Sequence, residues 1–191
     1  MSKASTELST PQLSRYFIGL LPPPEVQRYA TQVQAYFRDT YQSQAALRSP
    51  PHITLQAPFE WPAVDSEQLV ATLSQFRTLT PSIPIRLSGF GAFPPRVIFL
   101  AVEHTPALMT LQAELKQYVE DALGIIDRRS RDRPFRPHLT VAFRDLQPTA
   151  FRRSWPEFEP QTVQFDFDVQ ALTLLRHTGH RWEIERSLPL Q

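Results

Sequence analysis

The chain has 191 residues, of which 41% are hydrophobic, so it is long enough to bury a core. Its formal net charge is +1, which gives no strong overall electrostatic attraction for nucleic acid. The longest apolar run, residues 97–102, is too short to cross a membrane, and the polar residues 1–14 lack the apolar stretch of a secretory signal, so we expect a disordered tail on a cytoplasmic protein. Cysteine is absent, which excludes disulfides, thiolate zinc sites and cysteine nucleophiles and leaves histidine and hydroxyl chemistry.

The predicted elements alternate between strands and helices. In chain order they are a strand at 15–21, a helix from the prolines 22–24 to about residue 41, a strand at 52–57, a helix at 66–79, strands at 83–90 and 96–103, a helix at 106–123 that Gly124 ends, a strand at 138–143, a helical turn around 151–155, and strands near 162–168, 171–176 and 181–188 with a turn at Thr178-Gly179. Each half places a helix before a similar histidine-containing strand. We therefore predict an α+β fold for residues 15–191: one bilobal, pseudo-twofold domain in which two antiparallel sheets face a central cleft and carry helices on their outer sides.

A five-residue pattern occurs twice, as PHITL at 51–55 and as PHLTV at 137–141. Side chains alternate between the two faces of a strand, so the histidine and threonine of each pattern share one face and the aliphatic residues share the other. If the aliphatic residues are buried under helices, His52, Thr54, His138 and Thr140 must line the cleft. A single H-x-T triplet is weak evidence, whereas two in corresponding places are typical of a paired site.

Two imidazoles opposed across a phosphate form an acid–base pair, because one takes a proton from water while the other gives a proton to the leaving oxygen. The threonine hydroxyls are placed to hydrogen-bond the other phosphoryl oxygens. We expect neither a metal nor another cofactor, since two histidines need a third ligand and neither has the spacing of a zinc site. The alternative interpretation is two ordinary strand histidines, exposed or packed in a core.

Arginine accounts for 18 of the 20 basic residues, and it suits bidentate phosphate contacts, although a lineage bias explains the ratio equally well. The run Arg128, Arg129, Arg131, Arg133 and Arg136 precedes His138 and indicates either a solvated surface or a phosphate contact, with Arg136 the best candidate by proximity. Arg48 lies in a comparable place before His52. Arg144 keeps even spacing from His138 and points into the cleft if the strand continues without a bulge.

The remaining histidines and the phenylalanines carry weaker signals. We expect His177 and His180 to be exposed beside the Thr178-Gly179 turn, and His104 to be structural at the end of a strand. Phe17, Phe59, Phe93 and Phe143 are candidates for a base-stacking platform, although most phenylalanines must belong to the core.

The chain resembles the 2H phosphoesterase superfamily, which contains the 2'-5' RNA ligase-like proteins and cyclic nucleotide phosphodiesterases. The residues that carry this resemblance are His52–Leu55, Gly89–Gly91, the strand 97–102 and Phe135–Val141. The resemblance implies a bilobal fold with both H-x-T pairs in a central groove, acting without a metal on 2',3'-cyclic phosphates or 2'-5' phosphodiesters of RNA ends or nucleotides. One departure is Phe143, which stands before Arg144 where the RNA ligase type often has its arginine one position earlier.

Several alternatives stay open at this stage. The resemblance assigns His138 as the base and His52 as the acid, whereas the symmetry of the two patterns does not decide between them. We expect a monomer. A tRNA-splicing by-product esterase acting on ADP-ribose cyclic phosphate is a second enzyme hypothesis. A non-catalytic RNA- or nucleotide-binding module with the same fold is the alternative from a different class.

Overall fold

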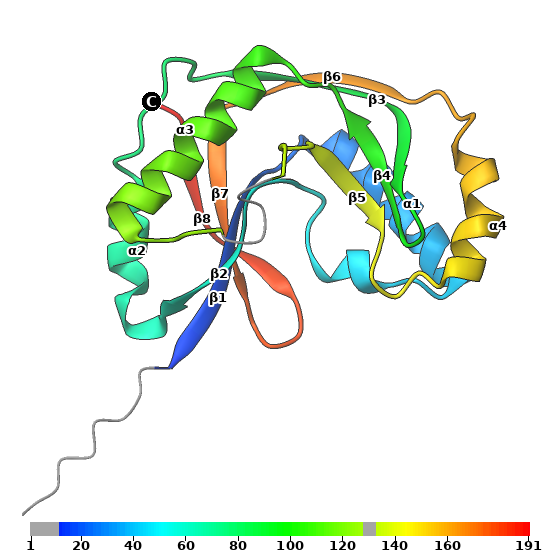
Figure 1. Ribbon diagram of the computed structural model, residues 1–191, viewed down its shortest axis with the longest axis horizontal. Coiled ribbons are helices and arrows are strands. Elements are labelled where there is room, and N and C mark those ends of the chain that lie inside the picture. Colours follow the sequence, from blue (N-terminus) through cyan, green and yellow to red (C-terminus); the bar gives the residue numbers. More distant parts are fainter. Residues whose placement is uncertain (1–11, 128–132) are drawn as a thin grey trace, which may run out of the picture.

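A computed structural model describes residues 12–127 and 133–191, and its elements follow the expected order (Figure 1). The strands are β1 (Leu13–Leu20), β2 (Ile53–Pro62), β3 (Ile83–Phe93), β4 (Val97–Val102), β5 (His138–Ala142), β6 (Gln164–Val169), β7 (Ala171–His177) and β8 (Trp182–Pro189). The α-helices are α1 (Pro24–Tyr41), α2 (Ser66–Leu73), α3 (Pro106–Leu123) and α4 (Pro148–Phe158), and short 3-10 helices occupy Ala45–Arg48 and Ala63–Asp65. Most of the expected tail lies outside the described residues, but Leu13 and Ser14 already belong to β1.

The strands form one antiparallel sheet in the order β6-β3-β4-β5-β2-β1-β7-β8. The expectation of two separate sheets is therefore wrong, because β2 and β5 lie side by side in the middle and pair at Ile53 and Leu139. Only that residue pair joins them, so each half of the curved sheet keeps four strands. The two histidine-containing strands thus meet at the seam between the halves, which preserves the predicted pseudo-twofold arrangement.

The core lies between the sheet and its helices. Figure 1 places α2 and α3 over one half and α1 and α4 at the other; α1 contacts β5, and α3 contacts β2 and β3. Ile53, Leu55, Leu139 and Val141 are buried in this core, as the alternation in the two patterns predicted. The histidines and threonines between them therefore lie on the face of the sheet that the helices leave open. Within the described residues, no helix has the length and apolar character needed to cross a membrane.

Helix boundaries agree with the sequence where caps mark them and differ where they do not. The helix α3 begins with Thr105, whose hydroxyl accepts a hydrogen bond from the Leu108 amide, and ends at Gly124, which adopts the left-handed conformation with φ 65°. The helix α2 is shorter than predicted, because the chain leaves the helix after Leu73 and buries Phe76 from a turn instead. The expected helical turn around residues 151–155 is a full helix, α4.

Candidate active site

The two H-x-T patterns lie on neighbouring antiparallel strands, and their register determines how the four polar residues face one another. Because Ile53 pairs with Leu139, one step along each strand sets His52 opposite Thr140 and Thr54 opposite His138. All four side chains line one cavity of about 390 Å³. The structure therefore brings together the predicted set, and each threonine lies across from the histidine of the other pattern.

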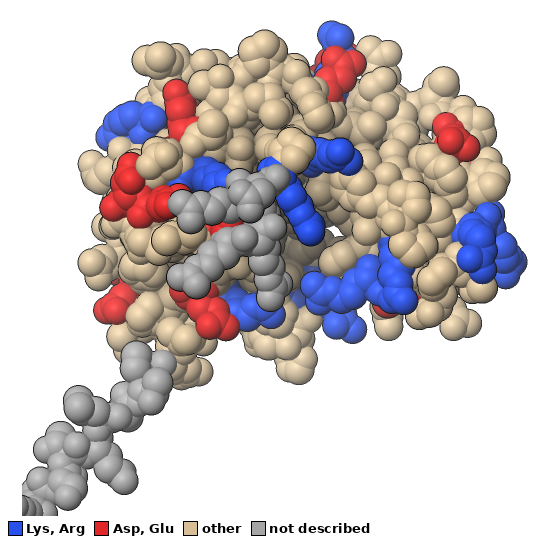
Figure 2. Space-filling view, in the orientation of Figure 1, with Lys and Arg blue, Asp and Glu red and all other residues tan. Residues whose placement is uncertain are grey.

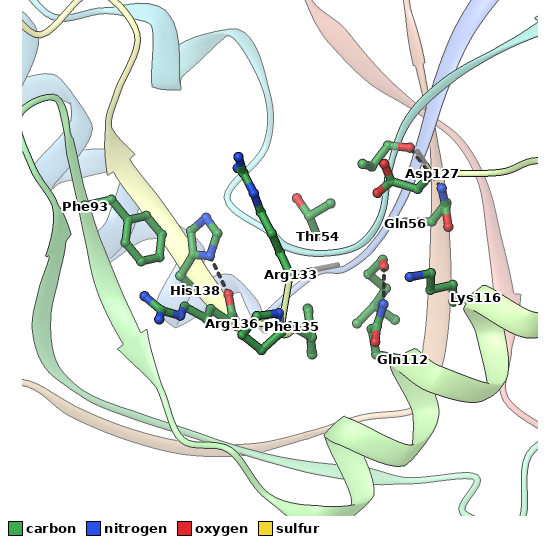
Figure 3. A pocket seen from close by; sticks show the side chains of 13 residues that line it. Thr54, Gln56, Phe93, Gln112, Lys116, Asp127, Arg133, Phe135, Arg136 and His138 are labelled. Carbon is green, nitrogen blue, oxygen red and sulfur yellow. Dashed lines mark hydrogen bonds between the residues drawn. The ribbon is translucent and has the colours of Figure 1, made fainter. Parts of the chain in front are cut away.

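Each histidine is held by a hydrogen bond to the carbonyl two residues before it. The Nδ1 atom of His52 lies 2.7 Å from the Pro50 oxygen, and Nδ1 of His138 lies 2.7 Å from the Arg136 oxygen. A carbonyl oxygen only accepts, so Nδ1 must carry the proton in both rings. The Nε2 atom of each neutral ring is then available to accept a proton. In Figure 3 the His138 ring extends from its hydrogen-bonded Nδ1 edge into a second cavity, which adjoins the first.

Aromatic side chains pack against both imidazoles. The ring of Phe17 lies 4.5 Å from that of His52, and the rings of Phe93 and Phe99 lie 5.1 and 5.2 Å from that of His138. Phe99 occupies its place because Gly91, on the paired strand β3, has no side chain: a Cβ there would lie 2.3 Å from the Phe99 ring. The glycine in the Gly89–Gly91 segment thus positions the packing partner of a candidate catalytic residue.

Burial in this apolar setting lowers the pKa of both histidines. Desolvation, with a smaller effect of the nearby His138, lowers the pKa of His52 from 6.5 to about 4, against the opposing effect of the Pro50 hydrogen bond. Desolvation also lowers the pKa of His138, opposed by its bond to the Arg136 carbonyl. Both rings are therefore neutral in the free protein at neutral pH. A bound phosphate anion favours the charged form and raises both pKa values again.

Two cavities meet at the histidines. The cavity of about 390 Å³ continues into a second one of about 540 Å³, and the two share Thr54, Phe93 and His138. The first cavity is also lined by Arg15, Phe17, Gln34, Arg48, His52, Pro58, Val97, Thr140, Phe143, Arg144, His177 and Trp182, among others. The second is also lined by Leu55, Gln56, Ala57, Gln112, Lys116, Asp127, Arg133, Pro134, Phe135 and Arg136 (Figure 3). A ligand at the histidines thus has room to extend in two directions.

The predicted arginines lie around these cavities. Arg48, in the 3-10 helix before β2, lines the smaller cavity, and Arg136 lines the larger. Figure 3 shows that Arg133 also extends into the larger cavity. Three further members of the arginine run, Arg128, Arg129 and Arg131, lie outside the described residues.

Arg144 lines the smaller cavity, although not for the reason expected. The strand β5 ends at Ala142, and Arg144 has the left-handed conformation with φ 61°, so the premise of a continuing strand is wrong. Its guanidinium lies 5.1 Å from the centre of the Phe143 ring. The turn after β5, rather than strand alternation, directs this arginine.

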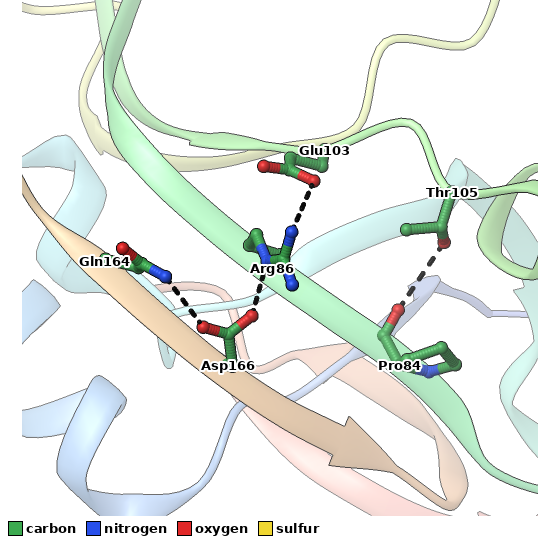
Figure 4. Close-up of polar contacts among 6 residues, drawn as sticks. All are labelled: Pro84, Arg86, Glu103, Thr105, Gln164 and Asp166. Carbon is green, nitrogen blue, oxygen red and sulfur yellow. Dashed lines mark hydrogen bonds and ion pairs between the residues drawn. The ribbon is translucent and has the colours of Figure 1, made fainter.

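The cavity arginines differ from those elsewhere on the sheet. Near the β6 edge, Arg86 binds Asp166 and Glu103 (Figure 4), and the Arg86 guanidinium lowers the pKa of the Asp166 carboxyl. By contrast, within residues 12–127 and 133–191, no ion pair joins a carboxylate to Arg15, Arg48 or Arg144. The ion pairs found there involve Arg38, Arg86, Arg176, Arg181 and Arg186. Figure 2 shows Lys and Arg side chains around the hollow in the middle of one face. Arg15, Arg48 and Arg144 therefore present positive charge to the smaller cavity without an ion-paired carboxylate among the described residues.

Three polar residues that sequence reasoning missed hold the site together. The Asp145 carboxylate accepts hydrogen bonds from the Ser43 hydroxyl and the backbone amides of Gln44 and Ala45, at 2.8 to 2.9 Å, which ties the segment carrying Arg48 to the turn after β5. The amide of Gln34 in α1 donates to the Thr140 carbonyl in β5, and that of Gln112 in α3 donates to the Leu55 carbonyl in β2. The two glutamines act in corresponding places of the two halves. Only the tertiary fold reveals these contacts, since each joins residues far apart in sequence.

The weaker predictions have mixed outcomes. His180 is exposed, as expected, but His177 is half-buried and lines the smaller cavity, so the expectation of an exposed residue is wrong. His104 is exposed in the loop before α3 and is not packed as a structural residue. Phe17, Phe93 and Phe143 line the smaller cavity, whereas the fourth candidate, Phe59, packs beside Tyr16 in the core. In the described part of the chain, no group of three His, Cys, Asp or Glu side chains is arranged to hold a metal ion.

Comparisons with known proteins give consistent matches. The family model described as "2'-5' RNA ligase superfamily" matches residues 22–181. A candidate phosphoesterase of Geobacillus kaustophilus is 32% identical over 166 residues, covering 84% of this chain and 87% of that protein. Among solved structures, E. coli LigT complexed with 3'-AMP has a TM-score of 0.66 at 21% identity, covering 94% of this chain and 99% of that one. TT0787 of Thermus thermophilus has a TM-score of 0.62 at 23% identity, covering 92% and 97%, respectively. The two structural matches establish a common fold.

Proposed function

The chain belongs to the 2'-5' RNA ligase superfamily, and on this basis we propose that it is a phosphoesterase that cleaves 2',3'-cyclic phosphates or 2'-5' phosphodiesters of RNA ends or nucleotides by two-histidine acid–base catalysis without a metal. The observation that carries the proposal is the matched pair of Nδ1 hydrogen bonds from His52 and His138, which leaves two Nε2 atoms at one cavity. The 3'-AMP in the LigT complex, a nucleotide monophosphate, supports a substrate of this class.

The proposed reaction on a 2',3'-cyclic phosphate uses each ring once. His138, as the base, accepts a proton from water at Nε2 while the water oxygen attacks phosphorus. The bond between phosphorus and the ribose 3'-oxygen breaks, and the protonated His52 gives its Nε2 proton to that oxygen. The acid role requires His52 to be protonated when the substrate is bound. Burial lowers its pKa to about 4 in the free protein, and the substrate anion opposes this effect because it favours the charged ring.

The threonines and Arg144 stabilise charge in this scheme. Each threonine hydroxyl lies across from the histidine of the other strand, so the two hydroxyls approach the phosphoryl group from both sides. As negative charge accumulates on the nonbridging oxygens, hydrogen bonds from Thr54 and Thr140 strengthen. Arg144 supplies a guanidinium to the same cavity, and Arg48 and Arg136 lie where neighbouring phosphates would extend.

A substrate panel tests the proposal. It contains 2',3'-cyclic nucleotides, 2'-5' and 3'-5' dinucleotides and ADP-ribose cyclic phosphate, each offered to the wild type, His52→Ala, His138→Ala and the double variant. His104→Ala is the matched control, because this histidine is exposed outside both cavities. We expect either single change to remove most activity, the double variant to be little worse, and the pH–rate profile to be bell-shaped.

The products provide a second test. A fixed acid serves only one ribose oxygen, so phosphorus NMR should show a single monoester, the 2'-phosphate. An equal mixture of 2'- and 3'-phosphates would refute fixed roles for the two histidines. If the wild type turns over no member of the panel yet binds nucleotides, the chain is instead the non-catalytic binding module considered above.

A further inference from the structure

Three residues outside the H-x-T patterns form a row across neighbouring strands at one end of the smaller cavity. His177, the last residue of β7, pairs with Trp182, the first residue of β8. Arg15 in β1 lies one position before Tyr16, which pairs with Arg176, so the register sets Arg15 beside His177. All three side chains line the cavity that contains His52.

The tautomer of His177 is the opposite of that of the two candidate catalytic histidines. The backbone amide of Gly179 donates to Nδ1 of His177 at 3.1 Å, so Nδ1 is the acceptor and the neutral ring carries its proton on Nε2. In His52 and His138 Nδ1 is the donor and Nε2 the acceptor. His177 therefore presents an N–H group where the other two present a base, which suits it to bind an anion rather than to remove a proton.

Positive charge converges on this histidine from arginines that form no ion pair within the described part of the chain. Arg15 stacks over the Trp182 ring at 5.6 Å, and no carboxylate of the described residues forms an ion pair with Arg15 or Arg48. Burial lowers the pKa of His177, and the charges of Arg15, His180, Arg144 and Arg48 lower it further. Two acidic side chains of β8 are engaged elsewhere, since Glu183 binds Arg181 and Glu185 binds Arg176. Glu60 lies across from Arg15 in the β1–β2 pairing, but no ion pair joins them.

This charge exceeds what the reacting group requires. A phosphodiester carries one negative charge, and the protonated acid, two threonine hydroxyls and Arg144 already surround it in the proposed reaction. Arg15, Arg48 and the His177 N–H are left over at the same cavity. Guanidinium groups and N–H donors without carboxylates are the usual partners of phosphate, so the surplus calls for a second anion of this kind.

A row of aromatic rings in contact connects the two places. Ring centres are 4.5 Å apart between His52 and Phe17, 4.7 Å between Phe17 and Trp182, and 4.9 Å between Trp182 and His177. The Phe17–Trp182 and Trp182–His177 contacts are edge-to-face, at 75° and 70°, and Phe17 is buried, so the row is not a flat stacking platform. Its apolar rings suit packing against a nucleoside that lies between the two places. The arrangement therefore fits a nucleotide whose two phosphates lie at its two ends.

We propose that Arg15, Arg48 and His177, with the Trp182 ring beneath Arg15, form a second phosphate subsite that selects substrates carrying a phosphate in addition to the reacting one. The inference rests on the proposed function for the position of the reacting phosphate. The second phosphate has two possible sources, which are a 5'-phosphate on the same nucleotide and the next phosphodiester of an oligonucleotide.

Three substrates test the subsite: adenosine 2',3'-cyclic phosphate, its 5'-phosphorylated form, and the dinucleotide ApA ending in a 2',3'-cyclic phosphate. We expect the wild type to favour at least one of the two substrates with a second phosphate by about tenfold or more in kcat/KM, the size of a charge-assisted contact. The substrate that gains identifies the source. Arg15→Gln and His177→Ala should bring this ratio toward one, and Arg15→Lys should retain part of it.

Arg181→Gln is the matched control, because Arg181 belongs to the same hairpin but is paired with Glu183 outside the smaller cavity. It should keep the wild-type ratio. Equal kcat/KM for all three substrates in the wild type, or a preference that survives both Arg15→Gln and His177→Ala in folded protein, overturns the proposal.

A binding measurement separates failure of the subsite from failure of the proposed function. If no cyclic phosphate is turned over, calorimetry compares adenosine 3'-monophosphate with adenosine 3',5'-bisphosphate and with ApA 3'-monophosphate. We expect one of the ligands with a second phosphate to bind the wild type about tenfold more tightly and to lose this gain in Arg15→Gln. If neither binds the wild type more tightly, the subsite is refuted whatever the enzyme activity.

Discussion

Acid should destabilise this protein through His52, and the direction follows from the pKa of its imidazole. Burial holds that pKa at about 4 in the folded protein, against 6.5 for the ordinary side chain. Between these two values the unfolded chain binds a proton on His52 that the folded protein does not bind. The stability that is present above about pH 6.5 is therefore lost as the pH falls from about 6.5 through about 4, because the extra proton favours the unfolded state.

The magnitude follows from the same two pKa values. Each unit of difference corresponds to about 1.4 kcal/mol, so the free energy of unfolding should fall by about 2 kcal/mol by pH 5 and by about 3 kcal/mol below pH 4. A change of this size is a substantial part of the stability of a typical domain. His138 adds an effect of the same sign, since burial lowers its pKa as well.

Urea unfolding at about pH 7 and pH 5 measures this effect in the wild type and in His52→Gln. His138 is present in both proteins, so its contribution cancels in the comparison. We expect the wild type to lose about 2 kcal/mol more than His52→Gln on going to pH 5. His104→Gln, at an exposed position, should follow the wild type. Parallel losses in wild type and His52→Gln would refute the argument that burial holds this imidazole neutral.

Four further results are expected. Activity should survive EDTA, because the proposed mechanism uses only imidazole, hydroxyl and guanidinium groups; loss that a divalent ion restores would contradict this. Thr54→Ala and Thr140→Ala should each lower kcat by roughly ten- to a hundredfold, less than the histidine changes, as one hydrogen bond to a charged oxygen is lost. Gly91→Ala should lower the free energy of unfolding in urea by about 1 to 3 kcal/mol and reduce kcat, because its Cβ would lie 2.3 Å from the Phe99 ring. The double variant Gly91→Ala/Phe99→Leu should recover stability, and no recovery would place the strain elsewhere. Asp145→Ala should raise KM more than it lowers kcat, because it releases the segment that carries Arg48, and an unchanged KM would argue against that role.

The sequence predicted local structure well where spacing and caps are explicit. The helix α3 has the predicted bounds because Thr105 and Gly124 mark its ends. The helix α2 is shorter than its apolar pattern predicts. The pattern continues to Leu79, but Leu79 is 96% exposed, and Phe76 is buried from the turn that follows α2. The pairing of β2 with β5 could not be predicted from the sequence. It consists of one residue pair, Ile53 with Leu139, which forms only when the two halves of the fold pack together.

At the site, strand alternation succeeded inside strands and failed at their ends. It correctly placed Ile53 and Leu139 in the core and the polar members of both patterns on the open face. Arg144 lies at the cavity because a left-handed turn directs it there. His177 and Trp182 line the cavity from the ends of β7 and β8, although the turn between them is exposed. Arg15 was accessible to the same reasoning, because it lies two residues before Phe17 and shares its face of β1.

The symmetry of the two H-x-T patterns raises the question of how one substrate orientation is selected. The hydrogen bonds at His52 and His138 are alike, so the histidines alone would accept a nucleotide either way round. Their surroundings differ. Beyond His52 lie the Trp182 ring and the cations around His177, whereas the larger cavity beyond His138 is lined by Gln56, Gln112, Lys116, Asp127, Arg133 and Arg136. Both sides carry arginines, but only the first combines them with the Trp182 ring and the N–H group of His177. A nucleoside whose second phosphate binds there has its reacting phosphate held with one ribose oxygen toward His52. The asymmetry of the groove, rather than the histidines themselves, is then what gives the acid and the base their separate roles.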